Sequence, residues 1–242
     1  DFDPVELRRR NIIPVEAIPF KTSLVFTYDS GEFEKNMDEA LEMAGHAGFA
    51  GRREEAKARG MLRGIGVANA IERAAPPGVE TAEIRFDPSG TVTILSGTTH
   101  QGQGHTTMYT QLLCDRLGLE ADQVRVIEGD TDRLAYGTGA GGSRSSAMGT
   151  AALVMAADRI VEKGRQIASV VLEAAVDDIE FEDGTFTIAG TDRNVSLADV
   201  VRDAFTGANL PEDMEPGMLA HAAYHGKVPS YPNGCHVCEV EI

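Results

Sequence analysis

Two glycine-rich stretches hold the side chains best suited to chemistry in this 242-residue sequence. The first loop runs from Gly97 to His105 and the second loop from Gly137 to Ser146, and each precedes a predicted helix. Glycine lets a backbone approach a ligand closely. A helix start offers unpaired N–H groups and a partial positive charge, which attract anions. The pattern therefore predicts a large, phosphate-bearing ligand held by backbone N–H, amide and hydroxyl groups.

In the first loop, amide side chains alternate with glycines, and the candidate binding residues are Gln101, Gly102, Gln103, Gly104 and His105. An amide both donates and accepts hydrogen bonds, so it suits a heterocycle edge or a phosphate oxygen. The loop is not a Walker P-loop because no lysine follows its glycines, and its glycine spacing differs from a Rossmann fingerprint. A tight structural turn remains the alternative for such a loop.

In the second loop, the candidate binding residues are Gly142, Ser143, Arg144, Ser145 and Ser146. Arg144 is the only cation between Arg133 and Asp158 and follows four glycines at a predicted helix start. This position favours a phosphate contact over a plain surface arginine, and a charge-assisted hydrogen bond there contributes about 1.5–3 kcal/mol. The serines also suit helix caps, a role compatible with ligand binding because both use the same N–H groups.

Two further motifs resemble metal sites. His100 and His105 flank the amides, but as metal ligands they lack a nearby third partner, which disfavours zinc. Cys235 and Cys238 have the spacing of a zinc or redox motif, but they fall on a predicted strand. Residues three apart on a strand face opposite sides, so the two thiols cannot bind one metal. We therefore assign no metal ligand and no catalytic residue.

The composition restricts the possible partners and location. The formal net charge of −16 argues against binding to nucleic acid or to an anionic membrane surface. A hydrophobic content of 42% and a charged content of 25% are ordinary for a globular chain. No apolar run approaches the roughly 20 residues needed to span a bilayer. Three cysteines do not indicate a disulfide scaffold, so we expect a cytoplasmic protein.

Apolar spacing and capping residues predict the helices. The first is capped by Asp3 and ends before Pro14. The helix after the first loop is predicted to turn Met108 and Leu112 inward, with Leu113 and Leu117 as further candidates. The remaining predicted helices are Phe33–Ala44, Arg52–Arg59, Thr106–Leu117, Ser143–Glu173 and a short one from the cap Ser196 to Phe205.

Alternation and turn residues predict the strands. Asp87–Gly90 and Asp183–Gly184 are hairpin signals between consecutive strands. The predicted strands are Ile65–Ala70, Thr81–Phe86, Thr91–Leu95, Val124–Ile127, Ile179–Phe181, Thr185–Ile188, Leu219–His225 and Cys235–Ile242.

The first loop closely resembles the Gln-Gly-Gln-Gly-His stretch of the molybdenum-binding large subunits of the xanthine dehydrogenase and aldehyde oxidase family. The variant looks most like aerobic carbon monoxide dehydrogenase large subunits. Further matches occur in family order along nearly the whole chain, at Pro4–Asn11, Gly64–Val67, Gly129–Asp132, Tyr136–Gly139, Gly142–Ser145 and Tyr231–Val237.

The resemblance implies an α+β fold, a two-layer mixed sheet with packed helices of the molybdenum cofactor-binding type. Residues 1–60 would be a helical connector from the first cofactor-binding subdomain, and residues 61–242 a second, incomplete molybdopterin-binding subdomain. The implied cofactor is molybdenum with molybdopterin cytosine dinucleotide. By the resemblance, Gln101–His105 contact the pterin and phosphate region, and Gly142–Ser146 form a second contact loop.

The resemblance also implies a redox activity, the oxidation of carbon monoxide, an aldehyde or a heterocycle with water as the oxygen source. Electrons would leave through an iron–sulfur small subunit and an FAD-binding medium subunit, in a dimer of heterotrimers. The substrate-side loop and the glutamate base of the family have no match here. We therefore expect a piece of a longer polypeptide that is inactive alone and does not hold the cofactor tightly. The alternatives are a non-redox module that binds another phosphorylated ligand, and an acidic structural domain whose glycines only make turns.

Overall fold

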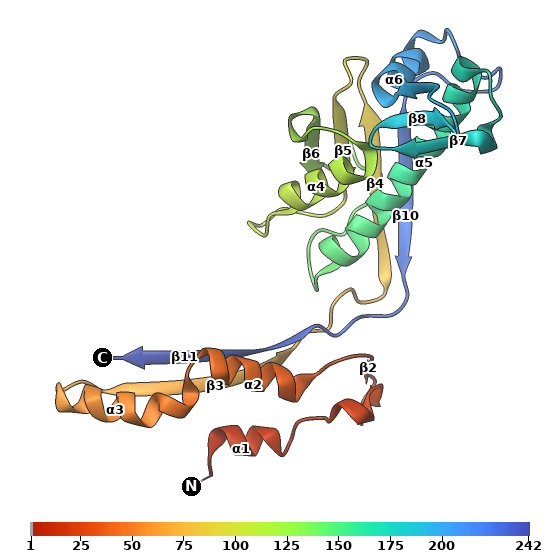
Figure 1. Ribbon diagram of the computed structural model, residues 1–242. Helices are drawn as coiled ribbons and strands as arrows, with labels where there is room; N and C mark the ends of the chain where they lie inside the picture. The colour runs from red at the N-terminus through yellow and green to blue at the C-terminus, as the bar shows by residue number, and fades with distance from the viewer. Residues whose placement is uncertain (1) are drawn as a thin grey trace. The chain divides into compact units, whose positions relative to one another are not determined.

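The computed structural model describes residues 2–242, which divide into two compact units (Figure 1). Unit 1 contains the chain up to Ala74 together with Pro229–Ile242, and unit 2 contains Ala75–Val228. The predicted boundary between residues 1–60 and 61–242 separates subdomains of the longer protein and stays a prediction. Every helix within residues 2–242 is too short or too polar to cross a bilayer.

Unit 1 is a helical layer with two small antiparallel sheets, in which β1 pairs with β2 and β3 with β11. Asp3 caps the first helix as predicted, because its carboxylate accepts the N–H groups of Val5 and Glu6 at 2.8 and 2.9 Å. The elements of unit 1 are α1 (Pro4–Arg9), β1 (Phe20–Lys21), β2 (Thr27–Tyr28), α2 (Phe33–Met43), α3 (Phe49–Ala58), β3 (Arg63–Ile71) and β11 (Asn233–Glu241).

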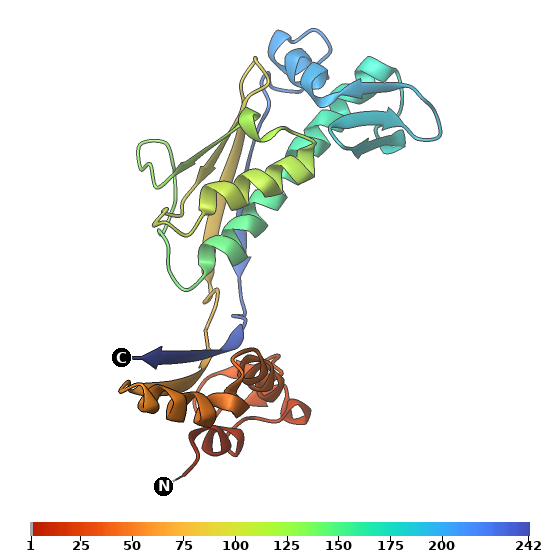
Figure 2. The same cartoon turned by 60° about the vertical axis from the view of Figure 1, so that its left-hand side comes forward.

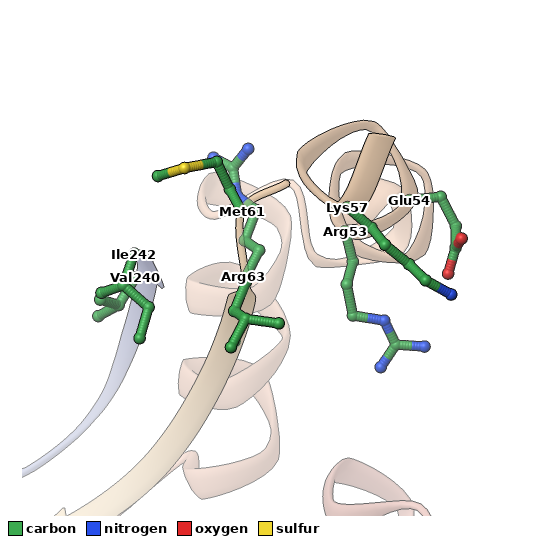
Figure 3. A pocket seen from close by; sticks show the side chains of 9 residues that line it. Arg53, Glu54, Lys57, Met61, Arg63, Val240 and Ile242 are labelled. Carbon is green, nitrogen blue, oxygen red and sulfur yellow. The ribbon is translucent and has the colours of Figure 1, made fainter. Parts of the chain in front are cut away.

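An ion pair joins the helices of unit 1 to its longer sheet. The Arg52 guanidinium donates two hydrogen bonds, of 2.9 and 2.6 Å, to the Glu239 carboxylate on β11, which lowers the pKa of Glu239. A surface hollow of about 540 Å³ lies between α3 and the β3–β11 pair (Figure 3). Its lining includes Arg53, Lys57 and Met61, and none of the predicted binding residues.

Unit 2 contains a mixed four-stranded sheet in the order β10-β4-β5-β6, antiparallel except for the parallel pair β5–β6. A smaller antiparallel sheet has the order β7-β8-β9. The elements are β4 (Gly78–Phe86), β5 (Val92–Ser96), α4 (His105–Leu117), β6 (Val124–Glu128), α5 (Thr150–Leu172), β7 (Ile179–Glu182), β8 (Thr185–Ile188), β9 (Asn194–Ser196), α6 (Leu197–Thr206) and β10 (Leu219–Gly226). The predicted α+β class and mixed sheet are confirmed.

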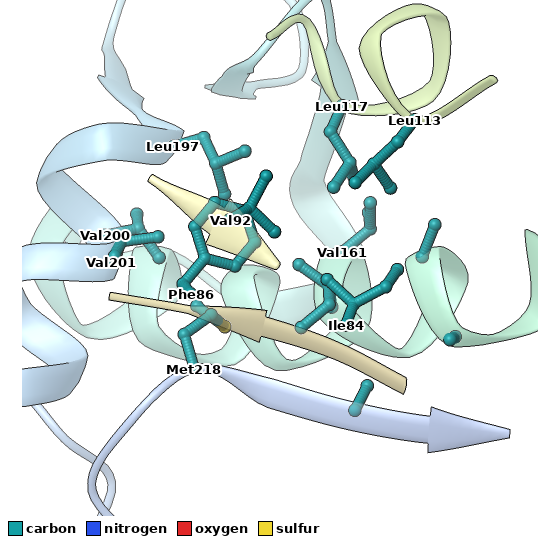
Figure 4. Close-up of a cluster of buried hydrophobic side chains, with 14 of the residues drawn as sticks. Ile84, Phe86, Val92, Leu113, Leu117, Val161, Leu197, Val200, Val201 and Met218 are labelled. Atoms are coloured by element: carbon teal, nitrogen blue, oxygen red, sulfur yellow. The ribbon is translucent and has the colours of Figure 1, made fainter. Parts of the chain in front are cut away.

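Helices α4 and α5 pack side by side on the four-stranded sheet and begin at the same end of unit 2 (Figure 2). Apolar side chains from both helices, the sheet and α6 form one core (Figure 4). Leu113 and Leu117 are fully buried, as predicted. Met108 and Leu112 are only partly buried, because the buried face of α4 runs through Tyr109.

The predicted long helix after the second loop has an irregular first turn. Ser145–Gly149 forms a π-helical turn, and the regular helix α5 begins at Thr150. Single π turns inside helices are frequently found at functional sites. The sequence pattern did not indicate this turn, because apolar periodicity does not separate a π turn from an α turn.

Two helical glycines give a test of the packing. A Cβ at Gly164 of α5 would clash with the ring of Phe186, which is fully buried, whereas a Cβ at Gly51 of α3 would meet nothing within 4 Å among the described residues. We expect Gly164→Ala to destabilise the protein by about 1–3 kcal/mol through overpacking. Gly51→Ala should stabilise it by about 0.5–1 kcal/mol. Urea unfolding measures both, and a neutral Gly164→Ala would contradict the packing of α5 on β8.

Candidate functional site

The core-facing rows of three neighbouring strands in unit 2 become polar at one end of the sheet. Glu80 on β4, Ser96 on β5 and Glu128 on β6 continue rows that are otherwise apolar. Ser96 lies opposite Ala82 and Glu128 in the register, and Glu80 comes two residues before Ala82 on the same face of β4. The three polar positions therefore lie at the same end of the sheet. Glu80 is 0% exposed, and the side chain of Glu128 is 6% exposed. Buried carboxylates are costly unless they are hydrogen-bonded, so this end of the sheet needs donors.

The first loop supplies donors to Glu128. One carboxylate oxygen, Oε1, accepts the Thr98 hydroxyl at 2.6 Å and His105 Nδ1 at 2.8 Å. Thr98 also lies 3.0 Å from the hydroxyl of Ser96. With Nδ1 assigned as the donor to a carboxylate, a neutral His105 ring carries no proton on Nε2. The glutamate thus fixes both ends of the first loop.

The second loop supplies donors to Glu80. Its Oε1 accepts the Thr138 hydroxyl at 2.9 Å and forms an ion pair with Arg144 Nη2 at 2.8 Å. Arg144 Nη2 donates its hydrogen bond to the carbonyl of Val79 at 2.8 Å. Arg144, the predicted phosphate contact, is therefore partly committed inside the protein, with a side chain 18% exposed. Glu80 Oε2 and Arg144 Nε are buried without a partner among the described residues.

The two loops cross in close contact. A Cβ on Gly97 would lie 2.5 Å from the Cα of Gly137, so a side chain at this crossing requires a backbone shift. Gly139 N–H donates to the carbonyl of Gly97 at 3.1 Å. Gly97 and Gly137 therefore allow the two glycine-rich loops to pack against each other.

Tyr109 connects the helix starts that follow the two loops. Its hydroxyl donates to the carbonyl of Ser145 at 3.0 Å and lies 3.2 Å from Thr98 Oγ1. Burial raises the pKa of Tyr109, so the phenol stays protonated and remains a donor. The structure therefore brings the two loops together at one end of the α4–α5 pair.

Both helix starts have free N–H groups. Gly104 is the N-cap of α4 and Arg144 that of the π turn, and among residues 2–242 no side chain caps either start. A Cβ at Gly102, Gly104 or Gly141 would meet nothing within 4 Å. The backbone is thus open to a ligand at both loops.

Some polar residues of the two loops already make hydrogen bonds within the protein, and others do not. Gln103 Oε1 accepts the N–H of Gln101 at 2.5 Å, and the Ser146 hydroxyl donates to the carbonyl of Ser143 at 3.3 Å. No side-chain hydrogen bond of Gln101 is found within residues 2–242. Gly142 has no side chain, and its carbonyl accepts the N–H of Ala75 at 2.7 Å.

The structure corrects the expectation that His100 and His105 have no third partner. Glu128 lies beside them. One ring nitrogen of each histidine and one carboxylate oxygen of Glu128 all lie within 4.8 Å of one another. The Glu128 oxygen that faces His105 already accepts two hydrogen bonds, so the cluster forms a hydrogen-bond network. Cys235 and Cys238 both lie on β11, as predicted, with Cys238 exposed.

Sequence reasoning missed Glu80, Tyr109 and Glu128. A signal was present for both acids, since each lies in phase with the apolar row of its strand. Glu80 alternates with Ala82 and Ile84, and Glu128 alternates with Val126. An acid in a core-facing position predicts a buried partner, although not which one.

The comparisons with known proteins assign the family. The family model described as molybdopterin cofactor-binding domain matches residues 39–242. The chain belongs to this family. The predicted resemblance to the molybdenum-binding large subunits is confirmed.

The relatives match nearly the whole of this chain. The chain is 34% identical to the carbon monoxide dehydrogenase large chain of Hydrogenophaga pseudoflava, over 100% of this chain and 32% of the relative. It is 32% identical to the 6-hydroxypseudooxynicotine dehydrogenase complex subunit gamma of Paenarthrobacter nicotinovorans, over 98% of this chain and 30% of the relative. The solved Cu,Mo-CO dehydrogenase superposes with a TM-score of 0.83 at 32% identity, over 100% of this chain and 32% of that chain. The chain thus spans about a third of the length of these relatives.

The loop crossing can be tested by substitution. Gly97→Ala should destabilise the protein by about 1–3 kcal/mol, because the new Cβ would meet backbone that cannot rotate away. Gly141→Ala, in the open part of the second loop, is the matched control and should leave the melting temperature unchanged. Equal melting temperatures for both variants would contradict the crossing.

Proposed function

We propose that the complete protein is a molybdenum hydroxylase and that this chain supplies two backbone loops that bind its molybdopterin cofactor. The main support is the pair of uncapped helix starts, held side by side by Tyr109, in a member of this family. In a chain of net charge −16, an anionic ligand needs such local dipoles.

The residues present fit the cofactor. The open glycines Gly102, Gly104 and Gly141 admit a ligand to the backbone. The N–H groups at the starts of α4 and the π turn would bind phosphate oxygens, and the uncommitted Gln101 amide would contact the pterin edge. No hydrogen bond of Arg144 Nη1 is found among residues 2–242, so this nitrogen can donate to phosphate while Nη2 remains on Glu80.

When bound, the cofactor supplies the redox chemistry, an oxidation of a substrate carbon with oxygen derived from water. The residues of this chain bind and orient it, and none is assigned a catalytic role. The relatives are named for different substrates at similar identity. Similarity in this segment therefore supports the reaction class, with carbon monoxide, an aldehyde or a heterocycle as the candidate substrate.

The finer assignments are part of the same proposal. The cofactor would be the cytosine dinucleotide form, and the ten candidate residues of the two loops would contact it. An iron–sulfur small subunit and an FAD-binding medium subunit would complete a dimer of heterotrimers in the cytoplasm. The names of the relatives, a subunit gamma and a large chain, support a multi-subunit enzyme. Residues 1–60 and 61–242 would belong to two successive cofactor-binding subdomains.

The cofactor content of the full-length protein tests the proposal. Denaturation should release molybdenum, pterin and a cytidine nucleotide in equimolar amounts, measured by mass spectrometry and chromatography. Release of a guanosine nucleotide, or of none, would contradict only the cytosine form. A phosphorylated ligand without molybdenum would favour the non-redox binding module instead.

Blocking the second loop provides a direct test of the site. Gly141→Val in the full-length protein places a side chain in the open space at the helix start, so cofactor release should accelerate by about tenfold or more, equivalent to about 1.4 kcal/mol. Gly66→Val on β3, where a Cβ also meets nothing within 4 Å, is the control and should release at the wild-type rate. Unchanged retention in Gly141→Val, with full folding, would remove the second loop from the site.

The isolated 242-residue chain should retain little cofactor and show no turnover, because the relatives are about three times longer. Metal analysis after reconstitution and an activity assay check this expectation. Stoichiometric molybdenum with turnover in the isolated chain would refute it.

A further inference from the structure

We propose that Glu128 is a positioning residue for the cofactor, acting through His105 to hold the first loop in its binding conformation. This inference rests on the proposed function and deepens it. Glu128 is not one of the predicted binding residues. It lies beneath the first loop, at the end of β6.

A single carboxylate oxygen closes the first loop. Glu128 Oε1 accepts one hydrogen bond from Thr98, where the loop begins, and one from His105, where it ends. The intervening Gly102 and Gly104 have φ values of +96° and +81° and no neighbours within 4 Å of a Cβ. Glycines in such a segment add conformational freedom, so the loop depends on its two anchored ends for order.

The same hydrogen bond sets the orientation and the tautomer of the His105 ring. His105 is the first residue of α4, and its side chain is 5% exposed. Donation from Nδ1 to the carboxylate fixes the ring orientation and the tautomer of the neutral ring, as buried carboxylates do for functional histidines. The N–H groups that begin α4 are thereby held in one orientation toward a ligand.

Side-chain contacts of Thr98 also connect the start of the first loop to the second loop. Thr98, which donates to Glu128, lies 3.2 Å from the Tyr109 hydroxyl, which donates to the carbonyl of Ser145. Loss of the Glu128 carboxylate would release Thr98 and His105 together. The first loop and its connection to the π turn would both be loosened.

A double-mutant cycle in the full-length protein tests this role. The variants are Glu128→Ala, His105→Ala and the double variant, and the measurement is the rate of pterin release during incubation, with the melting temperature recorded in parallel. Each single variant should release the cofactor about tenfold faster. The double variant should be no faster than the faster single variant, because Glu128 acts through His105.

Additive effects in the cycle would overturn the proposal, since Glu128 would then act independently of His105. Glu180→Ala, an exposed glutamate on β7, is the matched control and should release at the wild-type rate. If Glu128→Ala does not fold, Glu128→Gln carries the test. Its amide oxygen accepts the same two hydrogen bonds, so retention should stay near wild type, and fast release from a folded Glu128→Gln would overturn the hydrogen-bond role.

The outcomes separate this inference from the proposed function. Wild-type release from Glu128→Ala, together with fast release from His105→Ala, would refute only the role of Glu128. If His105→Ala releases pterin at the wild-type rate, both the role of Glu128 through His105 and the proposed cofactor contact of His105 would be refuted. The proposed role of the second loop would stand. A wild-type protein without any pterin would refute the proposed function, and this inference with it.

Discussion

The site depends on two buried carboxylates placed at one end of an apolar core. Glu80 and Glu128 continue the core-facing rows of β4 and β6, where water cannot solvate them. An unpaired buried carboxylate costs several kcal/mol, so each must receive hydrogen bonds from the chain above it. Thr98 and His105 bind one oxygen of Glu128, and Thr138 donates to one oxygen of Glu80, which also forms an ion pair with Arg144. One glycine-rich loop is thereby attached to each acid.

This arrangement leaves the outer side of the loops free. The hydrogen bonds to Glu80 and Glu128 are made beneath the loops, so within the described part of the chain the N–H groups at the two helix starts have no side-chain cap. The loops cross at Gly97 and Gly137, and Tyr109 joins the helices that follow. Two partial positive charges therefore lie close together in a strongly acidic protein, which favours a ligand with more than one anionic group.

Local patterns in the sequence predicted much of the fold. Asp3 capped α1, the Asp87–Gly90 turn joined β4 to β5, and Ser196 capped α6, because each signal acts within a few residues. The parts that were missed depend on distant pairs. Thr138 and Glu80 lie 58 residues apart, and His105 and Glu128 lie 23 apart, so no local rule joins them. Arg144 was predicted to contact phosphate, but its buried partner Glu80 could not be identified from spacing.

The most direct measurement of the central claim is a crystal structure of the full-length protein with its cofactor. The account predicts phosphate oxygens within hydrogen-bonding distance of backbone N–H groups at the starts of both α4 and the π turn, with Glu128 still bonded to His105. A cofactor whose phosphates lie away from both helix starts would contradict it.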